Sequence, residues 1–169
     1  GIVLVPEDRR SQGLVLQHTV GANLTLPLLR RLSRGGMLDD GRGEEIAQSY
    51  VERLGIRTRS LGTVVRRLSG GNQQKVVLAK WLATEPDVLI LDEPTVGVDI
   101  GTRSEIVDLV RRLADDGKAV LVISSELAEL LALADRILVL RDGRIDRSVA
   151  RSEVSDEPEL HRLVQEAAA

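Results

Sequence analysis

The sequence has no cysteine and no phenylalanine, and its only aromatic residues are Trp81 and Tyr50. Without cysteine, a disulfide framework and a thiolate metal site are both excluded. Because aromatic residues are so scarce, the hydrophobic core must be built from Leu, Val, Ile and Ala. Stacking platforms for single-stranded nucleic acid are disfavoured as well, since they depend on exposed rings.

Long apolar runs are also missing, and none approaches the roughly 20 residues needed to cross a bilayer. Apolar residues make up 43% and charged residues 29% of the chain, which excludes a disordered class. A length of 169 residues suits one globular domain or a large part of one. The only methionine is Met37, and the chain opens within the apolar run Ile2–Val5, so we expect a fragment of a longer protein.

Charge is unevenly distributed along the chain. The net charge is −3, with +4 over residues 1–67 and −7 over residues 68–169. The basic residues are scattered, which favours a solvated surface over a nucleic-acid-binding face. A basic first third remains compatible with an acidic partner.

Apolar runs at residues 2–5, 88–91 and 119–123 predict buried strands, and helical patterns separate them. This alternation indicates an α/β fold with a mostly parallel sheet. The run at 88–91 does not alternate, which is typical of a strand covered on both faces. The other expected elements are helices over 19–32 (bent at Pro27), 44–54, 72–82 and 126–134, a helix opened by a Thr102–Glu105 capping box, and a hairpin at Asp142-Gly143. Residues 19–67 lack convincing strands and are interpreted as a helical insertion, with a glycine-rich loop at 35–43.

Two adjacent carboxylates, Asp92 and Glu93, directly follow the apolar run Val88–Leu91. The carboxyl ends of strands are where open α/β sheets bind ligands, and neighbouring carboxylates repel each other without a cation. The functional interpretation is that Asp92 holds Mg²⁺, while Glu93 orients or deprotonates the water that attacks a phosphoryl group. The alternative is a strand that ends in surface acids before Pro94, and the motif alone is consistent with both.

A serine and two glycines, Ser69, Gly70 and Gly71, stand at the start of the predicted helix beyond Asn72. Glycines here leave backbone N–H groups unshielded, and the helix dipole adds to their attraction for anions. The Ser69 hydroxyl supplies one more donor for a phosphate oxygen. An ordinary N-cap with glycine spacers is the alternative, and by itself it is the commoner explanation.

A phosphate-binding loop of the pattern G-x-x-x-x-G-K-[ST] is missing from the sequence. The nearest approach, residues 36–43, has arginine in place of lysine and glycine in place of the hydroxyl residue. It also contains two aspartates, and no strand precedes it. We therefore reject it as a phosphate site.

Three sequence motifs, taken in their order along the chain, resemble those of one protein family. Leu68–Lys75 resembles the signature motif of ABC-type ATPases, Leu89–Thr95 their Walker B strand, and Val96–Asp99 the D-loop. The variant Asn72, the continuation Val98–Gly101 and the opening Pro6–Arg10 are similar to the second ATPase domain of the tandem ATP-binding subunits of monosaccharide importers. The resemblance covers residues 1 to about 149.

The resemblance implies a P-loop NTPase-like α/β domain over residues 1–149, truncated at its N-terminus, with a helical subdomain at about 19–67 and a C-terminal tail at 150–169. It also implies an ATP sandwich, in which the signature of one ATPase domain closes over ATP held by the phosphate loop of another. The implied nucleotide-binding residues are Ser69, Gly70, Gly71, Gln73, Asp99 and Ser125, with Glu93 catalytic and Asp92 and Glu7 at Mg²⁺.

The partners implied by the resemblance are a second ATPase domain, a membrane permease and, indirectly, a periplasmic or extracellular sugar-binding protein, with no nucleic acid. The protein would lie peripherally at the cytoplasmic face of the membrane and hydrolyse ATP to energise sugar import. The helical insertion and the loop at Glu7 would receive the coupling helix of the permease. Alone, the fragment is expected to bind ATP poorly.

Two residues depart from the family pattern. Glu7 stands where the family usually has a glutamine that touches Mg²⁺ and water, and its charge adds repulsion toward the γ-phosphate of a few kcal/mol, by rough estimate. Ser125 replaces the usual switch histidine and is too short for its contact. His18 and His161 lie far off in sequence and are expected at the surface. We therefore expect a degenerate ATP site at Glu93, with the signature serving the competent site.

Two other classes stay open. One is an ABC-type ATPase that acts on DNA or ribosomes, which the Asn72 signature and the opening Glu7–Arg9 disfavour. The other is a non-enzymatic interaction fragment.

Overall fold

In the computed structural model, which describes residues 1–168, the chain forms two compact units. The first unit is Gly1–Ile123, and the second begins at Ser124. The sequence-based boundary was expected at residue 149, whereas the compact units divide after the third strand of the parallel sheet. Each unit is described by itself below.

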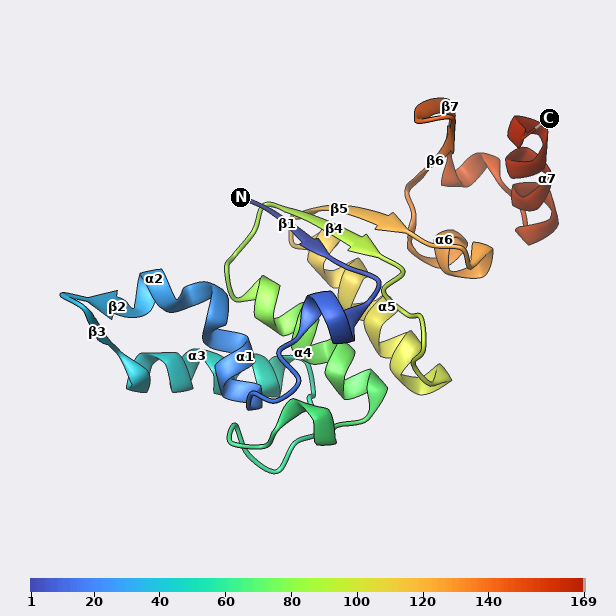
Figure 1. The fold of residues 1–169 in the computed structure, drawn as a ribbon. Coiled ribbons are helices and arrows are strands. Elements are labelled where there is room, and N and C mark those ends of the chain that lie inside the picture. Colours follow the sequence, from blue (N-terminus) through green and yellow to red (C-terminus); the bar gives the residue numbers. More distant parts are fainter. Residues whose placement is uncertain (169) are drawn as a thin grey trace. The chain divides into compact units, whose positions relative to one another are not determined.

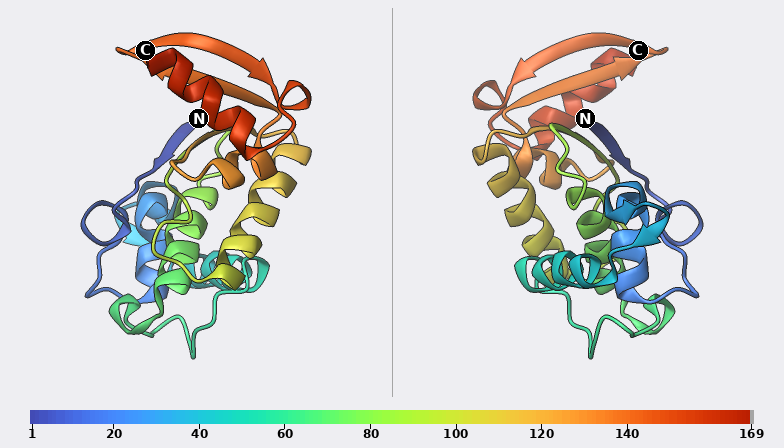
Figure 2. Two further views of the ribbon diagram at one scale, coloured as in Figure 1. Left: turned by 90° about the vertical axis from the view of Figure 1, so that its right-hand side faces the viewer. Right: turned by 90° about the vertical axis from the view of Figure 1, so that its left-hand side faces the viewer.

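A three-stranded parallel sheet forms the centre of the first unit (Figures 1 and 2). Its strands are β1 (Ile2–Val5), β4 (Val88–Asp92) and β5 (Ala119–Ile123), in the order β1-β4-β5. Helix α4 (Gly70–Leu82) packs on β1, and helix α5 (Ile100–Asp115) packs on β5. The prediction of an α/β fold with a parallel sheet is confirmed.

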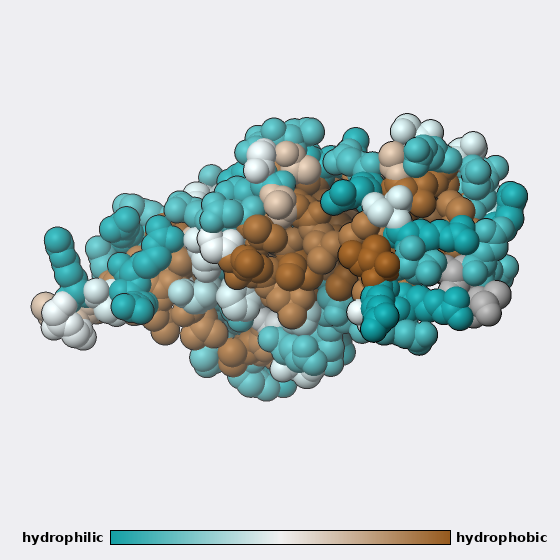
Figure 3. Space-filling view, turned by 90° about the horizontal axis from the view of Figure 1, so that it is seen from above, coloured by the Kyte–Doolittle hydropathy of each residue, from teal (hydrophilic) through white to brown (hydrophobic). Residues whose placement is uncertain are grey.

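The two faces of this sheet differ in burial. On one face Leu89 and Leu91 are fully buried, because the helices cover them. On the other face Ile2, Leu4 and Leu121 are 72%, 51% and 46% exposed, and apolar surface gathers over the sheet in Figure 3. Within residues 88–91, Leu89 and Leu91 are buried whereas Val88 and Ile90 are half-buried, so the described residues cover one face of this strand fully and the other only in part. An apolar run without alternation does not reveal which of its faces a helix covers.

The helical insertion is more broken than the periodicity indicates. Helix α1 (Val20–Thr25), the 3-10 turn η2 (Leu26–Leu28) and helix α2 (Leu29–Leu32) replace the single helix expected over 19–32. Pro27 lies within η2, where its ring and missing N–H interrupt the α-helical hydrogen bonds. Thr19 caps α1 by accepting a hydrogen bond from the Ala22 amide.

The glycine-rich stretch is partly hairpin and partly helix. Strands β2 (Ser33–Arg34) and β3 (Met37–Leu38) pair antiparallel across Gly35 and Gly36, which have φ of 59° and 83°. Helix α3 (Asp40–Arg53) then begins four residues before the expected Glu44. Asp39 is its N-cap, because the Asp39 side chain accepts a hydrogen bond from the backbone N of Arg42. The prediction that the insertion lacks strands is therefore wrong, because β2 and β3 pair within it. The prediction of a loop over 35–43 is also wrong, since the Asp39 cap outweighs the helix-breaking tendency of Gly41 and Gly43.

A buried amide joins the insertion to the segment that leaves the sheet. After β1 the chain makes the π-helical turn η1 (Arg9–Gly13) and then a short segment with a turn at Leu16–Gln17 before α1. Asn23 of α1 has no exposed surface. Its Oδ1 accepts a hydrogen bond from the Val15 amide at 2.9 Å, and its Nδ2 donates to the carbonyls of Val15 and Thr19, each at 3.0 Å. The 3-10 turn η3 (Val65–Arg67) then leads into α4.

The second unit contains helix α6 (Leu127–Leu133), strands β6 (Arg136–Arg141) and β7 (Arg144–Ala150), the turn η4 (Arg151–Glu153) and helix α7 (Glu157–Ala168). The predicted hairpin is confirmed, with Asp142 and Gly143 at φ of 48° and 73°. Val154 and Leu160 are each 1% exposed and pack with Ile137. Residues 150–168 therefore supply part of this unit's core. Across the 168 residues described, no helix is both long and apolar enough to cross a bilayer.

We predict that Asn23→Ala lowers the free energy of unfolding of the first unit by about 2–3 kcal/mol, because it leaves buried backbone groups unpaired. Chemical denaturation followed by the fluorescence of Trp81, the only tryptophan, measures this change. The control is Gln17→Ala, in the adjoining exposed stretch. Equal stability of the two variants would contradict the structural role of Asn23.

Candidate functional site

Ser69 begins helix α4 as its N-cap, which is the local role that the alternative interpretation of this motif, an ordinary N-cap with glycine spacers, gives it. The residue is exposed, and its Oγ accepts hydrogen bonds from the backbone N of Asn72 at 3.4 Å and from Asn72 Nδ2 at 2.9 Å. The side chain of Asn72 is held in turn by the Arg57 amide, which donates to Asn72 Oδ1 at 2.7 Å.

These contacts fix the direction of the Ser69 proton. A backbone N–H only donates, so Asn72 must turn its oxygen to Arg57 and its NH₂ to Ser69. The Ser69 oxygen thus accepts two hydrogen bonds, both from Asn72, and its own hydrogen stays available to donate to a ligand. The arrangement suits an acceptor such as a phosphate oxygen above the helix start.

Gly70 and Gly71 are required by packing. A Cβ atom on Gly71 would lie 2.6 Å from the Thr102 hydroxyl, and a Cβ atom on Gly70 would lie 3.0 Å from the Gly97 carbonyl oxygen. The first distance is shorter than real Cβ contacts and the second is tighter than most of them, so the two glycines let the start of α4 come close to α5 and the loop before it. The structure thereby brings the predicted signature and D-loop residues together.

Asp99, in the predicted D-loop, is the N-cap of α5. Its carboxylate accepts hydrogen bonds from the backbone N and the hydroxyl of Thr102, both at 2.9 Å. These two bonds hold the pKa of the Asp99 carboxyl below its usual value, so it stays ionised. The predicted Thr102–Glu105 capping box is wrong, because the cap lies three residues earlier and Thr102 is inside the helix.

Gln73 points into the protein. It is 3% exposed, and its Nε2 donates to the carbonyl oxygens of Val65 and Leu68 at 3.2 and 3.3 Å. The side chain therefore supports the segment that leads into the Ser69 turn, and it does not face the ligand side of that turn.

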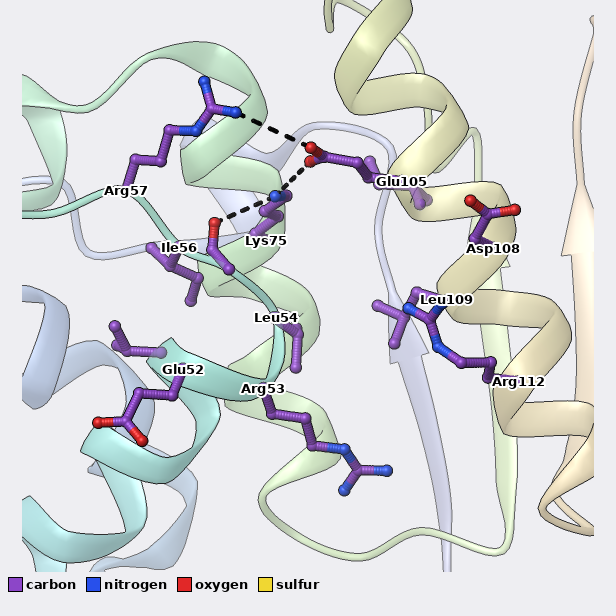
Figure 4. A pocket seen from close by; sticks show the side chains of 13 residues that line it. Glu52, Arg53, Leu54, Ile56, Arg57, Lys75, Glu105, Asp108, Leu109 and Arg112 are labelled. Carbon is purple, nitrogen blue, oxygen red and sulfur yellow. Dashed lines mark hydrogen bonds and ion pairs between the residues drawn. The ribbon is translucent and has the colours of Figure 1, made fainter.

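Lys75 joins the helical insertion to both α4 and α5 (Figure 4). Its side chain is 7% exposed, and its Nζ lies 2.5 Å from Glu105 Oε2 and donates to the Gly55 carbonyl at 3.2 Å. These bonds satisfy an ammonium group that would otherwise be costly to bury. Contact with Lys75 lowers the pKa of the Glu105 carboxyl. The pocket around these residues has a volume of about 670 Å³ and continues between Leu54 and Leu109.

The two predicted carboxylates lie at the carboxyl edge of the sheet. Asp92 ends β4, and Glu93 follows with a φ of 45°, a left-handed conformation that few non-glycine residues adopt. The backbone N of Glu93 donates to the Ile123 carbonyl at 2.8 Å, which extends the pairing with β5. Strained positions of this kind are concentrated at functional sites.

Glu7 reaches the same edge of the sheet from the neighbouring strand. Val5 is paired with Leu91 in parallel register, and Glu7 and Glu93 each follow by two residues. Glu7 is exposed. Among residues 1–168, no cluster of three or more His, Asp or Glu side chains is arranged to hold a metal ion.

Ser125 belongs to the second unit, in the loop before α6. The neighbouring Ser124 shapes this loop, because its hydroxyl donates to Glu129 at 2.6 Å and accepts from the Glu126 amide at 3.1 Å. His18 and His161 are both exposed, as expected from the sequence.

Sequence reasoning missed the hydrogen bonds that Arg9 donates to the carbonyls of Val96 and Gly97. It also missed the bonds of Asn72 and the Lys75–Glu105 pair. A lysine within the apolar stripe of a helix was a usable signal, because a lysine there needs a buried partner. Arg9 and Asn72 act through backbone groups distant in sequence, which no local pattern reveals.

Comparison with known proteins supports the resemblance to ABC-type ATPases. The sequence profile described as "ABC transporter" matches residues 2–96. Over 157 residues the chain is 52% identical to the ribose import ATP-binding protein RbsA of Rhodopirellula baltica, which covers 93% of this chain and 31% of that protein. It is 50% identical over 153 residues to the arabinose import ATP-binding protein AraG 2 of Burkholderia cenocepacia, covering 90% of the chain and 30% of that protein.

The fold is similar to that of a dimeric ATP-binding cassette, MJ0796, solved with ADP and phosphate. The TM-score is 0.74 at 29% identity, with 89% of this chain and 62% of that chain covered. The chain thus spans about a third of the length of the curated relatives it matches. On the matched profile, the order of its motifs and its fold, this chain belongs to the ABC transporter family of ATP-binding proteins.

Proposed function

We propose that the chain is part of an ATP-hydrolysing subunit that energises the import of a monosaccharide through a membrane permease. The names of the ribose and arabinose import relatives support this assignment. The observation that carries it is the turn before α4, where the exposed Ser69 hydroxyl accepts both of its hydrogen bonds from Asn72 and keeps its own proton for a ligand beside two glycines. Such a turn offers several N–H and O–H donors to one phosphate group.

ATP and Mg²⁺ are the ligands in this proposal. Asp92 ends β4, Glu7 lies two residues beyond the end of the neighbouring parallel strand β1, and both offer carboxylate oxygens, the donors that Mg²⁺ prefers. Mg²⁺ commonly takes one or two carboxylates, with phosphate and water oxygens completing its shell, so a larger cluster is not required. When bound, Mg²⁺ neutralises phosphate charge. Glu93 orients or deprotonates the attacking water.

A partner ATPase domain completes the site in this proposal. Ser69, Gly70 and Gly71 contact a triphosphate that the partner holds, and Asp99 lines the same seam while it caps α5. Gln73 acts indirectly, through the carbonyls of Val65 and Leu68. The site that uses Glu93 is weaker, because Glu7 adds negative charge and Ser125 lacks the reach of a histidine. The assembled ATPase lies at the cytoplasmic face of the membrane.

The permease contacts the helical insertion in this proposal. A groove of about 540 Å³ runs between α1, α2 and α3. Its apolar lining includes Ala22, Leu26, Leu29, Leu32, Leu38, Ala47 and Leu61, and its acidic lining consists of Asp39, Asp40 and Glu44. A short amphipathic helix with apolar and basic side chains complements this lining, and a cytoplasmic helix of the permease is the proposed occupant.

We predict that Ser69→Arg lowers the kcat of the assembled ATPase at least about a hundredfold, because the longer side chain fills the phosphate position and removes a donor. Glu93→Gln should cause a smaller loss, since the degenerate site contributes less turnover. Ser49→Arg, on the exposed surface of α3, is the control. A larger loss from Glu93→Gln than from Ser69→Arg would contradict the assignment of the competent site.

We predict that Asn72→Asp reduces ATP hydrolysis about tenfold. The aspartate keeps the acceptor for Arg57 but loses the donor to Ser69, and it adds negative charge beside the phosphate position. Gln48→Glu makes the same amide-to-acid change at an exposed position of α3 and should leave hydrolysis unchanged. Steady-state kinetics of the assembled ATPase measures both, and equal rates for the two variants would refute the role of Asn72.

We predict that Ala22→Arg abolishes copurification of the subunit with its permease, because the exposed Ala22 lines the groove and arginine fills it. Gln48→Arg, outside the groove, should leave complex formation intact. Normal recovery of the permease with the Ala22→Arg variant would place the contact elsewhere.

A further inference from the structure

The side chain of Arg9 spans from the loop after β1 to the D-loop. Arg9 Nη1 donates to the carbonyl oxygen of Val96 at 2.8 Å, and Nη2 donates to that of Gly97 at 3.1 Å. Gly97 has a φ of 68°, a backbone conformation that suits glycine. Two successive carbonyls of the D-loop are therefore held by one planar group.

The same guanidinium lies against the signature turn. A Cβ atom on Gly70 would lie 2.9 Å from Arg9 Nη2, and a Cβ atom on Gly97 would lie 3.3 Å from that nitrogen. The bare backbones of both glycines thus leave the space that the guanidinium fills. Arg9 is half-buried in this position.

Arginine is suited to this position for two reasons. Its rigid planar fork presents parallel N–H donors, whereas a lysine ammonium acts as a point charge on a flexible stem. Arginine also keeps its charge when partly buried, so a fixed positive charge stands beside the turn where a phosphate would bind.

We propose that Arg9 is a positioning residue that fixes the D-loop relative to the signature turn and ties both to the loop that contains Glu7. It acts through the carbonyls of Val96 and Gly97 and through packing on Gly70, without touching the nucleotide. The importance of this link for catalysis rests on the proposed function, but the link itself does not.

The first experiment measures the link directly. Hydrogen–deuterium exchange of residues 95–99 is compared in the nucleotide-free assembled ATPase for the wild type, Arg9→Gln and Arg10→Gln. Loss of two charge-assisted bonds should speed exchange in Arg9→Gln about tenfold. Arg10 is the exposed neighbour, so the same change there should leave exchange as in the wild type. Equal exchange in the two variants overturns the proposal.

The second experiment separates positioning from binding. Arg9→Gln should lower kcat about tenfold with a change in KM below about twofold, because the ligand contacts remain but are misaligned. Arg9→Lys keeps the charge and one donor, so it should recover part of the rate. This second variant also keeps the test possible if Arg9→Gln does not fold. Wild-type kcat in both Arg9 variants overturns the catalytic role.

The two hypotheses fail in different ways. If Ser69→Arg leaves hydrolysis unchanged, the proposed function fails while the exchange experiment still decides whether Arg9 holds the D-loop. If Ser69→Arg abolishes hydrolysis and Arg9→Gln changes neither exchange nor kcat, the proposed function stands and the inference about Arg9 is wrong.

Discussion

The backbone at the start of α4 touches the start of α5 and the loop before it with no room for a side chain between them. Gly71 faces the Thr102 side chain, where an alanine would clash, and Gly70 faces the Gly97 carbonyl, where an alanine would make an unusually tight contact. Atoms in protein interiors are packed too densely to yield by the required distance without shifting a helix. This close approach fixes where the Ser69 hydroxyl points and where the D-loop runs.

Hydrogen bonds to backbone carbonyls and amides hold the segments around this contact. Asn72 accepts from the amide of Arg57, Lys75 donates to the carbonyl of Gly55, and Arg9 donates to Val96 and Gly97. Each bond joins parts of the chain that are distant in sequence. The helical insertion is therefore attached to the signature helix through polar side chains rather than through apolar packing alone. Such bonds are directional, so they set an orientation that hydrophobic contact cannot set.

Much of the fold was readable in the sequence. The three strands and the hairpin at Asp142-Gly143 were predicted, because each depends on residues close together in the chain, and the cap at Ser69 matches the alternative interpretation of that motif. The predictions that were wrong also had local causes. The capping box at Thr102 competed with the stronger cap at Asp99, and the helix over 19–32 broke at Pro27. Two adjacent signals of the same kind cannot be ranked without the surrounding packing.

The sequence by itself determined the family and the α/β class, because motif order and apolar periodicity are properties of the chain alone. Only the tertiary structure decided that Gln73 supports the turn from behind, that Lys75 and Glu105 form a pair, and that Arg9 holds the D-loop. These roles depend on contacts between segments that pattern cannot bring together. The partner of a side chain depends on how the whole backbone folds, and the spacing of residues in the sequence does not predict which distant segments come into contact.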